Sequence, residues 1–179
     1  MYKLLLLLLP LSLLGCSMEA TSSTEKKHID TIKHVLEKQF TGPDQELVEL
    51  FEDPENVTVI GEGEESTSTE SPTELDKYLE KQYKSYFTPN MYERFIGNFA
   101  MDYPLRSHAT DYQFRVGSIE LDQVESTEGA YDFTVHVMYE KEGMDEKEKK
   151  VEGRVNVNDE GKISNIKILD DHGLHEKLE

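Results

Sequence analysis

The sequence predicts an α+β domain in which a helical layer packs on a curved, four- to five-stranded, mostly antiparallel sheet. From about residue 28 to 99, apolar residues recur at intervals of three and four, the spacing of an amphipathic helix. From about residue 110 they alternate with polar residues, the spacing of a half-buried strand. Turn sequences divide this second half into successive strands. Because the helices and the sheet each have one apolar face, they must cover each other.

The first fifteen residues have the order of a secretory signal peptide. Lys3 gives a basic start, leucines dominate residues 4–14, and Gly15 is a small residue at the cleavage position. This apolar run is too short for a bilayer core, which needs ~20 helical residues. We therefore predict that residues 1–15 are a signal peptide that is removed.

Cys16 follows this segment directly. The stretch Leu13-Leu14-Gly15-Cys16 resembles the lipobox of bacterial lipoproteins, although Leu14 stands where a smaller residue is usual. In that family the cysteine receives diacylglycerol, cleavage precedes it, and its new amino group is often acylated, for example with palmitate. The resemblance implies a chain anchored to the cell membrane through lipid at Cys16, on the extracytoplasmic face, since two or more acyl chains anchor stably. An ordinary signal peptide with a chance cysteine is the alternative.

Charge and cysteine content exclude several functions. The chain has 37 Asp and Glu against 19 Lys and Arg, a formal charge of −18. This argues against nucleic acid as a partner, because that binding needs basic residues to neutralise phosphates. Without residues 1–15, which hold one Lys and no acidic residue, the charge is −19. One Cys excludes an intramolecular disulfide and a Cys-rich zinc site. Cations or basic envelope proteins are candidate partners, with a merely solvated acidic surface as the alternative.

The N-terminal half of the mature chain is predicted to be mainly helical. Residues 16–27 comprise the lipidated cysteine and a polar, flexible tether. Residues 28–40 form a helix, and Gly42 is suited to a left-handed cap at its end. A second helix opens at Pro43 and ends before Pro54.

A short strand and an exposed loop are predicted next. Val57–Ile60 is a β-like run. Residues 61–71 carry several Glu among Ser, Thr and Gly but no apolar side chain, so they cannot contribute to a core. A calcium-binding loop is the alternative, but the Asp and Asn periodicity of an EF-hand is missing from this stretch.

Two further helices are predicted between residues 71 and 99. Ser71 can cap the first helix, with Pro72 at its first position and Glu74 completing a capping box. Thr88-Pro89 starts the second in the same way. Their aromatic residues exceed what simple core filling requires and suit a pocket wall or a homodimer face, with core packing as the alternative. These aromatic residues are Tyr78, Tyr83, Tyr86, Phe87, Tyr92, Phe95 and Phe99.

The remaining chain is predicted to be an antiparallel meander followed by a polar tail. A slip in the alternation at Gly117-Ser118 predicts a β-bulge in the first strand. Residues 28–170 thus form one α+β domain, and residues 171–179 a frayed tail. The expected strands cover about residues 112–121, 131–139, 151–157 and 163–168, with turns at 125–129, 143–146 and 158–161.

This order of elements resembles the nuclear-transport-factor-2-like (SnoaL-like, cone-shaped α+β) superfamily over about residues 28–170. The paired N-terminal helices, the helix at 73–87 and the bulged meander carry the resemblance. The chain departs from the pattern at Val57–Ile60, where the fold often has a hairpin, and in the long helix after Pro89. The superfamily includes isomerases, dehydratases, cargo-binding proteins and extracellular lipoprotein domains, so the resemblance implies a pocket between sheet and helices but assigns no function.

Candidate site residues gather around this expected pocket. A catalytic Asp, His or Tyr there would need burial that shifts its pKa. His136 is out of phase with the apolar residues of its strand and is expected on the other side of the sheet. His172 and His175, beside Asp170 and Asp171, could bind a metal weakly, but a frayed tail is the favoured interpretation, and no metal site is assigned. No catalytic residue or cofactor is assigned either, because no position matches a catalytic motif. The candidates are Tyr83, Tyr86, Phe95, Asp102, Tyr103, His108, Asp111 and Tyr112, each with a solvated or core residue as the alternative.

The sequence therefore favours a membrane-anchored extracytoplasmic lipoprotein whose non-catalytic domain binds a small molecule or an envelope protein. The first alternative is an enzyme of the isomerase or dehydratase type that uses an Asp or His in the pocket. The second is an envelope-maintenance protein that acts through dimerisation. A closed apolar cavity that contains Asp102, His108 or Asp111 would favour the enzyme.

Overall fold

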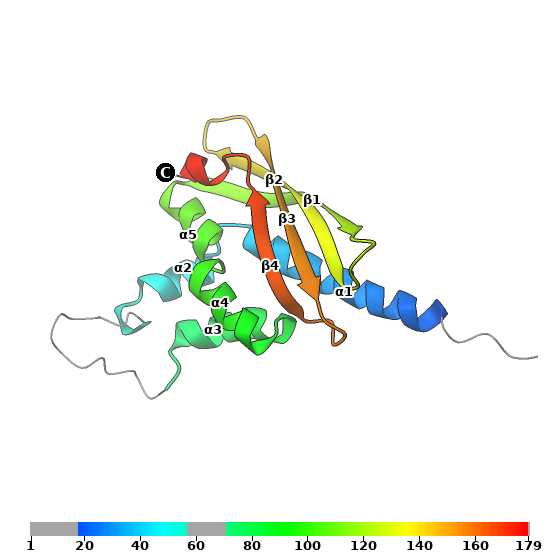
Figure 1. The fold of residues 1–179 in the computed structure, drawn as a ribbon. Helices are drawn as coiled ribbons and strands as arrows, with labels where there is room; N and C mark the ends of the chain where they lie inside the picture. The colour runs from blue at the N-terminus through cyan, green and yellow to red at the C-terminus, as the bar shows by residue number, and fades with distance from the viewer. Residues whose placement is uncertain (1–17, 57–70, 179) are drawn as a thin grey trace, which may run out of the picture.

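The computed structural model describes residues 18–56 and 71–178, whose arrangement Figure 1 shows. Helices pack on a four-stranded antiparallel sheet, which confirms the predicted α+β class. The predictions for the signal peptide and Cys16, and for the strand Val57–Ile60 and most of the acidic loop after it, lie outside the described residues.

The sheet is a meander with the strand order β1-β2-β3-β4. Along β2 and β3, buried residues alternate with half-buried or exposed ones, so one face packs on the helices and the other is solvated. The pairing of β1 with β2 shifts register between Val116 and Ser118, which confirms the predicted bulge. The strands are β1 (Tyr112–Gln123), β2 (Ala130–Lys141), β3 (Lys147–Val157) and β4 (Ile163–Asp170).

Within the described residues, five α-helices precede the sheet: α1, α4 and α5 pack on it, and α2 packs on α3 and α5 (Figure 1). Short 3-10 turns follow α2, α3 and β4, at Pro54–Asn56, Lys84–Tyr86 and His175–Leu178. The α-helices are α1 (Met18–Gln39), α2 (Gln45–Glu52), α3 (Glu74–Tyr83), α4 (Pro89–Asn98) and α5 (Asp102–Ala109).

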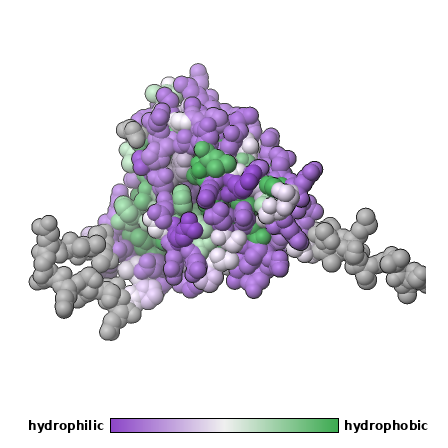
Figure 2. All heavy atoms as spheres, viewed as in Figure 1, coloured by the Kyte–Doolittle hydropathy of each residue, from purple (hydrophilic) through white to green (hydrophobic). Residues whose placement is uncertain are grey.

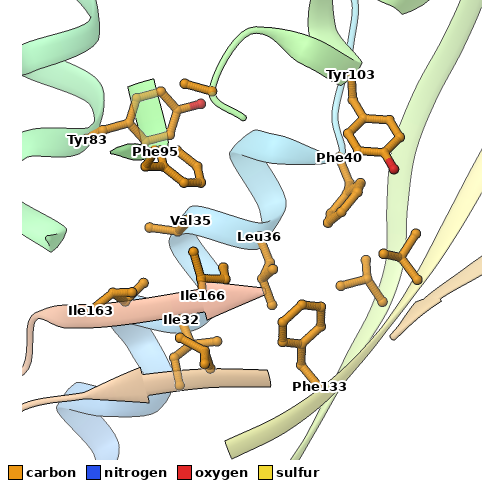
Figure 3. Packing of buried hydrophobic residues seen from close by; sticks show 14 of the residues in the cluster. Ile32, Val35, Leu36, Phe40, Tyr83, Phe95, Tyr103, Phe133, Ile163 and Ile166 are labelled. Atoms are coloured by element: carbon orange, nitrogen blue, oxygen red, sulfur yellow. The ribbon is translucent and has the colours of Figure 1, made fainter. Parts of the chain in front are cut away.

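A hydrophobic core fills the space between helices and sheet (Figure 3). Ile32 and Leu36 of α1 lie over the sheet, where they meet Phe133 of β2 and Ile166 of β4 (Figure 3). Gly153 of β3 makes room for the Phe133 ring, because a Cβ there would lie 2.3 Å from it. The face of the molecule seen in Figure 2 is largely hydrophilic, with hydrophobic patches between polar side chains.

The first helix is longer than predicted. α1 begins at Met18, so the prediction of a flexible tether is wrong for residues 18–27. These residues contain no Gly or Pro. Docking on the β3–β4 turn also supports the helix: Lys27 Nζ donates to the backbone O of Glu160 at 2.5 Å, and Thr31 Oγ1 donates to that of Gly161 at 3.1 Å.

The C-terminal segment is packed, so the prediction of a frayed tail is wrong for residues 171–178. Leu174 and Leu178 are buried in the core, although every residue around them is polar or Gly. The carboxylate of Asp171 accepts hydrogen bonds from the backbone N–H groups of Gly173 and His175, which fixes the turn that leads to them. Two apolar anchors are enough to order a short polar segment.

Of the two helices predicted between residues 71 and 99, the first needs a correction at its N-terminus. Thr73, not Ser71, caps α3, and it forms the capping box with Asp76 in place of Glu74. The helix predicted after Thr88-Pro89 is confirmed as α4, and a further helix, α5, follows it. The separate helix α5 was not predicted from the sequence.

Candidate functional site

An open groove lies where α5 meets β1 and the β2–β3 hairpin. Its volume is about 790 Å³, and most of the side chains that line it are polar or charged. Its walls come from the end of α5, the start of β1, the end of β2, the turn after β2 and the approach to α2. The lining residues are Pro43, Gln45, Ser107, His108, Asp111, Gln113, Glu140, Lys141, Glu142, Gly143 and Met144.

Gly42 fixes how α5 and β1 come together beside this groove. Its N–H donates to the O of Phe114 at 3.1 Å, and the N–H of Phe114 donates to the O of Gly42 at 2.7 Å. A Cβ at Gly42 would lie 2.5 Å from the Oγ of Ser107 and 3.1 Å from the Cα of Pro104, so this approach requires glycine. Gly42 has no positive φ, and the predicted left-handed cap is therefore wrong.

The ammonium of Lys141 occupies one corner of the groove. Its Nζ donates to the backbone O of Thr110 at 2.9 Å, lies 3.5 Å from Oδ2 of Asp111, and lies 5.7 Å from the centre of the Tyr112 ring. The carbonyl at a helix C-terminus, a carboxylate and the face of an aromatic ring each attract a cation. These three contacts show how the groove holds an ammonium group. The Lys141 ammonium also balances the charge of Asp111.

Two other carboxylates of the groove lack such a partner. Across residues 18–56 and 71–178, neither Glu140 nor Glu142 forms an ion pair. Met144, which is 57% exposed, lies on the adjoining turn. On the facing wall, His108 Nε2 is 3.4 Å from Oε1 of Glu52. The groove can therefore attract a cationic group and cover an apolar one next to it.

The space between sheet and helices is almost completely filled. The crevice that remains has a volume of about 10 Å³, close to the smallest that holds one water. Gln39 is its one polar residue: Nε2 donates to the O of Phe99 at 2.6 Å, whereas Oε1 is buried and finds no hydrogen-bond partner among the described residues. An unpaired buried acceptor costs about 1–3 kcal/mol. The crevice is lined by Leu36, Gln39, Phe40, Phe95, Phe99, Phe133, Ile166 and Ile168.

The residues predicted to line one pocket lie in separate places. Tyr83 and Phe95 are core residues, with ring centres 5.2 Å apart (Figure 3). Tyr86 stacks on His34 of α1, with ring centres 4.3 Å apart, and burial together with Lys38 lowers the pKa of His34. A single pocket does not form, because the aromatic stripe faces the core while residues 102–112 belong to α5 and the start of the sheet.

Asp102 and Tyr103 hold the C-terminal segment against α5. Oδ1 of Asp102 accepts a hydrogen bond from Nε of Arg106 at 2.6 Å, and its Oδ2 lies 3.7 Å from Nε2 of His175. The Tyr103 hydroxyl donates to Oδ2 of Asp171 at 3.2 Å. Burial, and then the charge of Asp171, raises the pKa of Tyr103. Both residues thus have a structural contact rather than a place in a pocket.

The remaining candidates lie on surfaces. His108 and Asp111 line the open groove, and Tyr112 packs against Tyr139 beside it, with ring centres 5.8 Å apart. His136 faces the solvated side of the sheet, as predicted, with Nδ1 2.8 Å from Oε1 of Glu148. His108 and Asp111 thus face an open, polar groove rather than the enclosed apolar cavity that the enzyme alternative requires.

Sequence reasoning missed the residues that give the groove its character. Met144 was assigned to the turn at 143–146, and Glu140, Lys141 and Glu142 lay between that turn and the strand predicted to end at 139. The available signal was a charged triplet close to an apolar residue in a turn. Nothing in the sequence marks Gln39, because a polar residue near the end of a helix is ordinary.

Comparison with known proteins identifies no relative of this chain. No protein-family model, curated protein or solved structure matches the chain. The likeness to the nuclear-transport-factor-2-like superfamily therefore stays a prediction. Among the residues described, no group of three or more His, Cys, Asp or Glu side chains is placed to hold a metal ion. None of the described helices is long and apolar enough to cross a bilayer.

Proposed function

We propose that this protein is a lipid-anchored, extracytoplasmic binding protein whose groove takes a basic segment of an envelope protein. The observation that carries the proposal is that Glu140 and Glu142, next to the exposed Met144, form no ion pair with any residue that the structure describes. A partner that places a Lys or Arg between the carboxylates and an apolar side chain on Met144 would use both features. The formal charge of −18 would favour approach of such a partner.

The groove proposal is tested with a short peptide as probe. We would titrate the full chain with acetyl-Gly-Lys-Leu-Lys-Gly-amide and with the same peptide carrying Glu in place of Lys. The Lys peptide is expected to bind and the Glu peptide not to bind, with an affinity that falls as salt increases. Equal binding of both peptides would contradict the proposal.

Matched charge variants separate the groove from the general acidity of the chain. The double variant Glu140→Gln, Glu142→Gln is expected to weaken Lys-peptide binding about five- to tenfold, because exposed charge pairs contribute ~0.2–1 kcal/mol each. Glu125→Gln with Glu128→Gln removes the same charge from the β1–β2 turn and serves as the control. If both double variants weaken binding equally, the groove is not the site.

The anchor is supported by the lipobox resemblance at Leu13-Leu14-Gly15-Cys16. Cys16→Ser should abolish acyl labelling and release the chain from the membrane fraction. A variant that stays with the membrane and keeps its label would show that the anchor lies elsewhere.

A second candidate function rests on the unpaired Oε1 of Gln39 at the crevice under the sheet. A slender apolar molecule that ends in a neutral donor, such as a hydroxyl, would satisfy this acceptor if Phe99 and Ile168 move aside. A medium-chain alcohol should then raise the melting temperature more than the methyl ether of equal length. Gln39→Leu should remove the difference, and equal effects in the unmodified chain would exclude this function.

A further inference from the structure

From Lys27 onward, α1 is docked on one end of the sheet. Its contacts with the β3–β4 turn start at Lys27, whose Nζ donates to the O of Glu160 at 2.5 Å, and continue with Thr31, whose Oγ1 donates to the O of Gly161 at 3.1 Å. His28 is buried beside these contacts, with Nδ1 3.3 Å from the hydroxyl of Tyr131 at the start of β2. The side chains of residues 23–26, in the preceding turn, are exposed.

The other end of α1 is fixed beside the groove. Gln39 in its last turn donates to the O of Phe99 at 2.6 Å, and Gly42, which follows it, pairs with Phe114 of β1. Between these two sets of contacts, Ile32 and Leu36 are fully buried against the sheet. Because α1 is held at several points between residues 27 and 39, it cannot pivot on the domain.

Only Ser17 separates Cys16 from the first residue of α1. We propose that α1 is a rigid stalk that holds the domain upright on the membrane, with the β1–β2 and β3–β4 turns toward the lipid and the groove turned away from it. This inference rests on the proposed lipidation of Cys16. It assigns the groove to partners that approach from outside the cell, not to lipids or to proteins embedded in the bilayer.

The two ends of the sheet lie far enough apart for this orientation to be measured. The N-terminal end of α1 projects on the side of the β1–β2 and β3–β4 turns, whereas the β2–β3 hairpin lies at the opposite end of the sheet (Figure 1). β3 connects the two ends with 11 residues, which span roughly 35 Å at ~3.3 Å per residue. α1 has 22 residues and is of similar length, roughly 33 Å.

Charge at the turns supports a domain that stands off the lipid. The β1–β2 turn carries Glu125 and Glu128, and the β3–β4 turn carries Asp159 and Glu160. Anionic lipid headgroups repel these carboxylates within about one Debye length, ~8 Å at physiological salt. The body of the domain is therefore not expected to lie flat on an anionic bilayer, and the helix sets the distance.

The single cysteine makes the test direct, because the proposed lipidation uses it and any added cysteine is then the only free thiol. Asp159→Cys and Asp145→Cys place one donor dye at an exposed position near each end of β3. The lipidated chain would be reconstituted into phosphatidylcholine–phosphatidylglycerol vesicles with an acceptor dye on the headgroups. We expect at least twofold higher energy transfer from position 159 than from position 145.

A helix-breaking variant distinguishes a rigid stalk from chance orientation. Lys26→Pro interrupts α1 in an exposed turn before its docked part, and it should bring the two transfer efficiencies together. A Gly-Ser insertion after Ser17 gives a second route to the same result if the proline variant does not fold. A persistent difference in both variants would show that α1 does not set the orientation.

The outcomes separate the stalk from the proposed anchor. Equal transfer from both positions, or more from position 145, overturns the stalk if Cys16→Ser still abolishes vesicle binding. If Cys16→Ser leaves vesicle binding unchanged, the proposed anchor fails and the stalk fails with it. Peptide binding by the groove is measured in solution and does not depend on either result.

Discussion

The two spaces beside the sheet differ in size, lining and expected role. Under the sheet, aromatic and aliphatic side chains leave about 10 Å³, whereas at its end a polar groove of about 790 Å³ is open to solvent. Close packing makes the first space a determinant of stability. Unpaired charge makes the second available to a partner. The residues that stabilise the fold are therefore separate from those that are available for binding. Substitutions at the filled space should change stability, whereas substitutions at the groove should change binding.

The largest expected effect is a loss of stability at the filled space. Phe95→Ala removes a ring that is 1% exposed and packs on Tyr83 and Phe87, and it should cost about 3–5 kcal/mol of unfolding free energy. Urea denaturation followed by circular dichroism would measure it. Phe51→Ala on α2 is the matched control, since that ring is 47% exposed and should cost much less. Similar losses in the two variants would remove the contrast between core and surface.

A smaller loss is expected at the C-terminal segment. Burial alone would raise the pKa of Asp171, but hydrogen bonds from the N–H groups of His175 and Gly173 and from the Tyr103 hydroxyl outweigh it and hold the pKa below its ordinary value. The ionised carboxylate therefore stabilises the fold at neutral pH. Asp171→Ala should cost roughly 1–3 kcal/mol at pH 7, because three hydrogen bonds to a half-buried charge are lost.

The same carboxylate gives a pH dependence of known sign. A depressed pKa in the folded state means that its contribution is complete above about pH 4, the unfolded pKa, and is lost as the pH falls through the folded value. Urea midpoints between pH 7 and pH 2 should fall less steeply in Asp171→Asn than in the unmodified chain. Parallel curves would show that Asp171 does not carry this contribution.

Sequence periodicity was sufficient for most of the fold because each strand and helix buries one face. The change of period near residue 110, the bulge after Val116 and the turn that ends at Gly161 were all predictable from local pattern. What failed depended on distant contacts. The polar start of α1 is helical where the sequence suggested a tether, and Leu174 orders a segment that composition alone marks as frayed.

The site was less predictable than the fold for a related reason. Phe95 and Asp102 belong to neighbouring segments, yet Phe95 faces the core and Asp102 the C-terminal segment, because α4 and α5 are separate helices. The groove forms between segments about thirty residues apart, from Asp111 to Met144, and it requires Gly42 from a third. A pattern read along one chain segment cannot show which charges such an assembly leaves unpaired.

A small change in stability is expected on substitution of Gln39, the one polar residue that lines the crevice. Gln39→Leu loses the hydrogen bond to the O of Phe99 but also removes the unpaired Oε1, so the two changes offset and stability should shift by less than about 1 kcal/mol. Gln39→Ala, which leaves a void as well, should cost about 2 kcal/mol more. A large loss in Gln39→Leu would mean that Oε1 has a partner, such as a bound water or ligand.

The smallest effect on stability is expected at the groove. Glu140 and Glu142 are exposed and form no ion pair within the described part of the chain, so Glu140→Gln with Glu142→Gln should change the unfolding free energy by no more than about 0.5 kcal/mol. Lys141→Gln should instead strengthen binding, since it removes the ion pair of Asp111 and so adds a third carboxylate that can face a cation. That variant should bind the Lys peptide about two- to fivefold more tightly, measured by the same titration. Weaker binding would mean that Lys141 contacts the peptide itself. The groove would then still be more open than the filled space, but its unpaired carboxylates would not be what attracts the peptide.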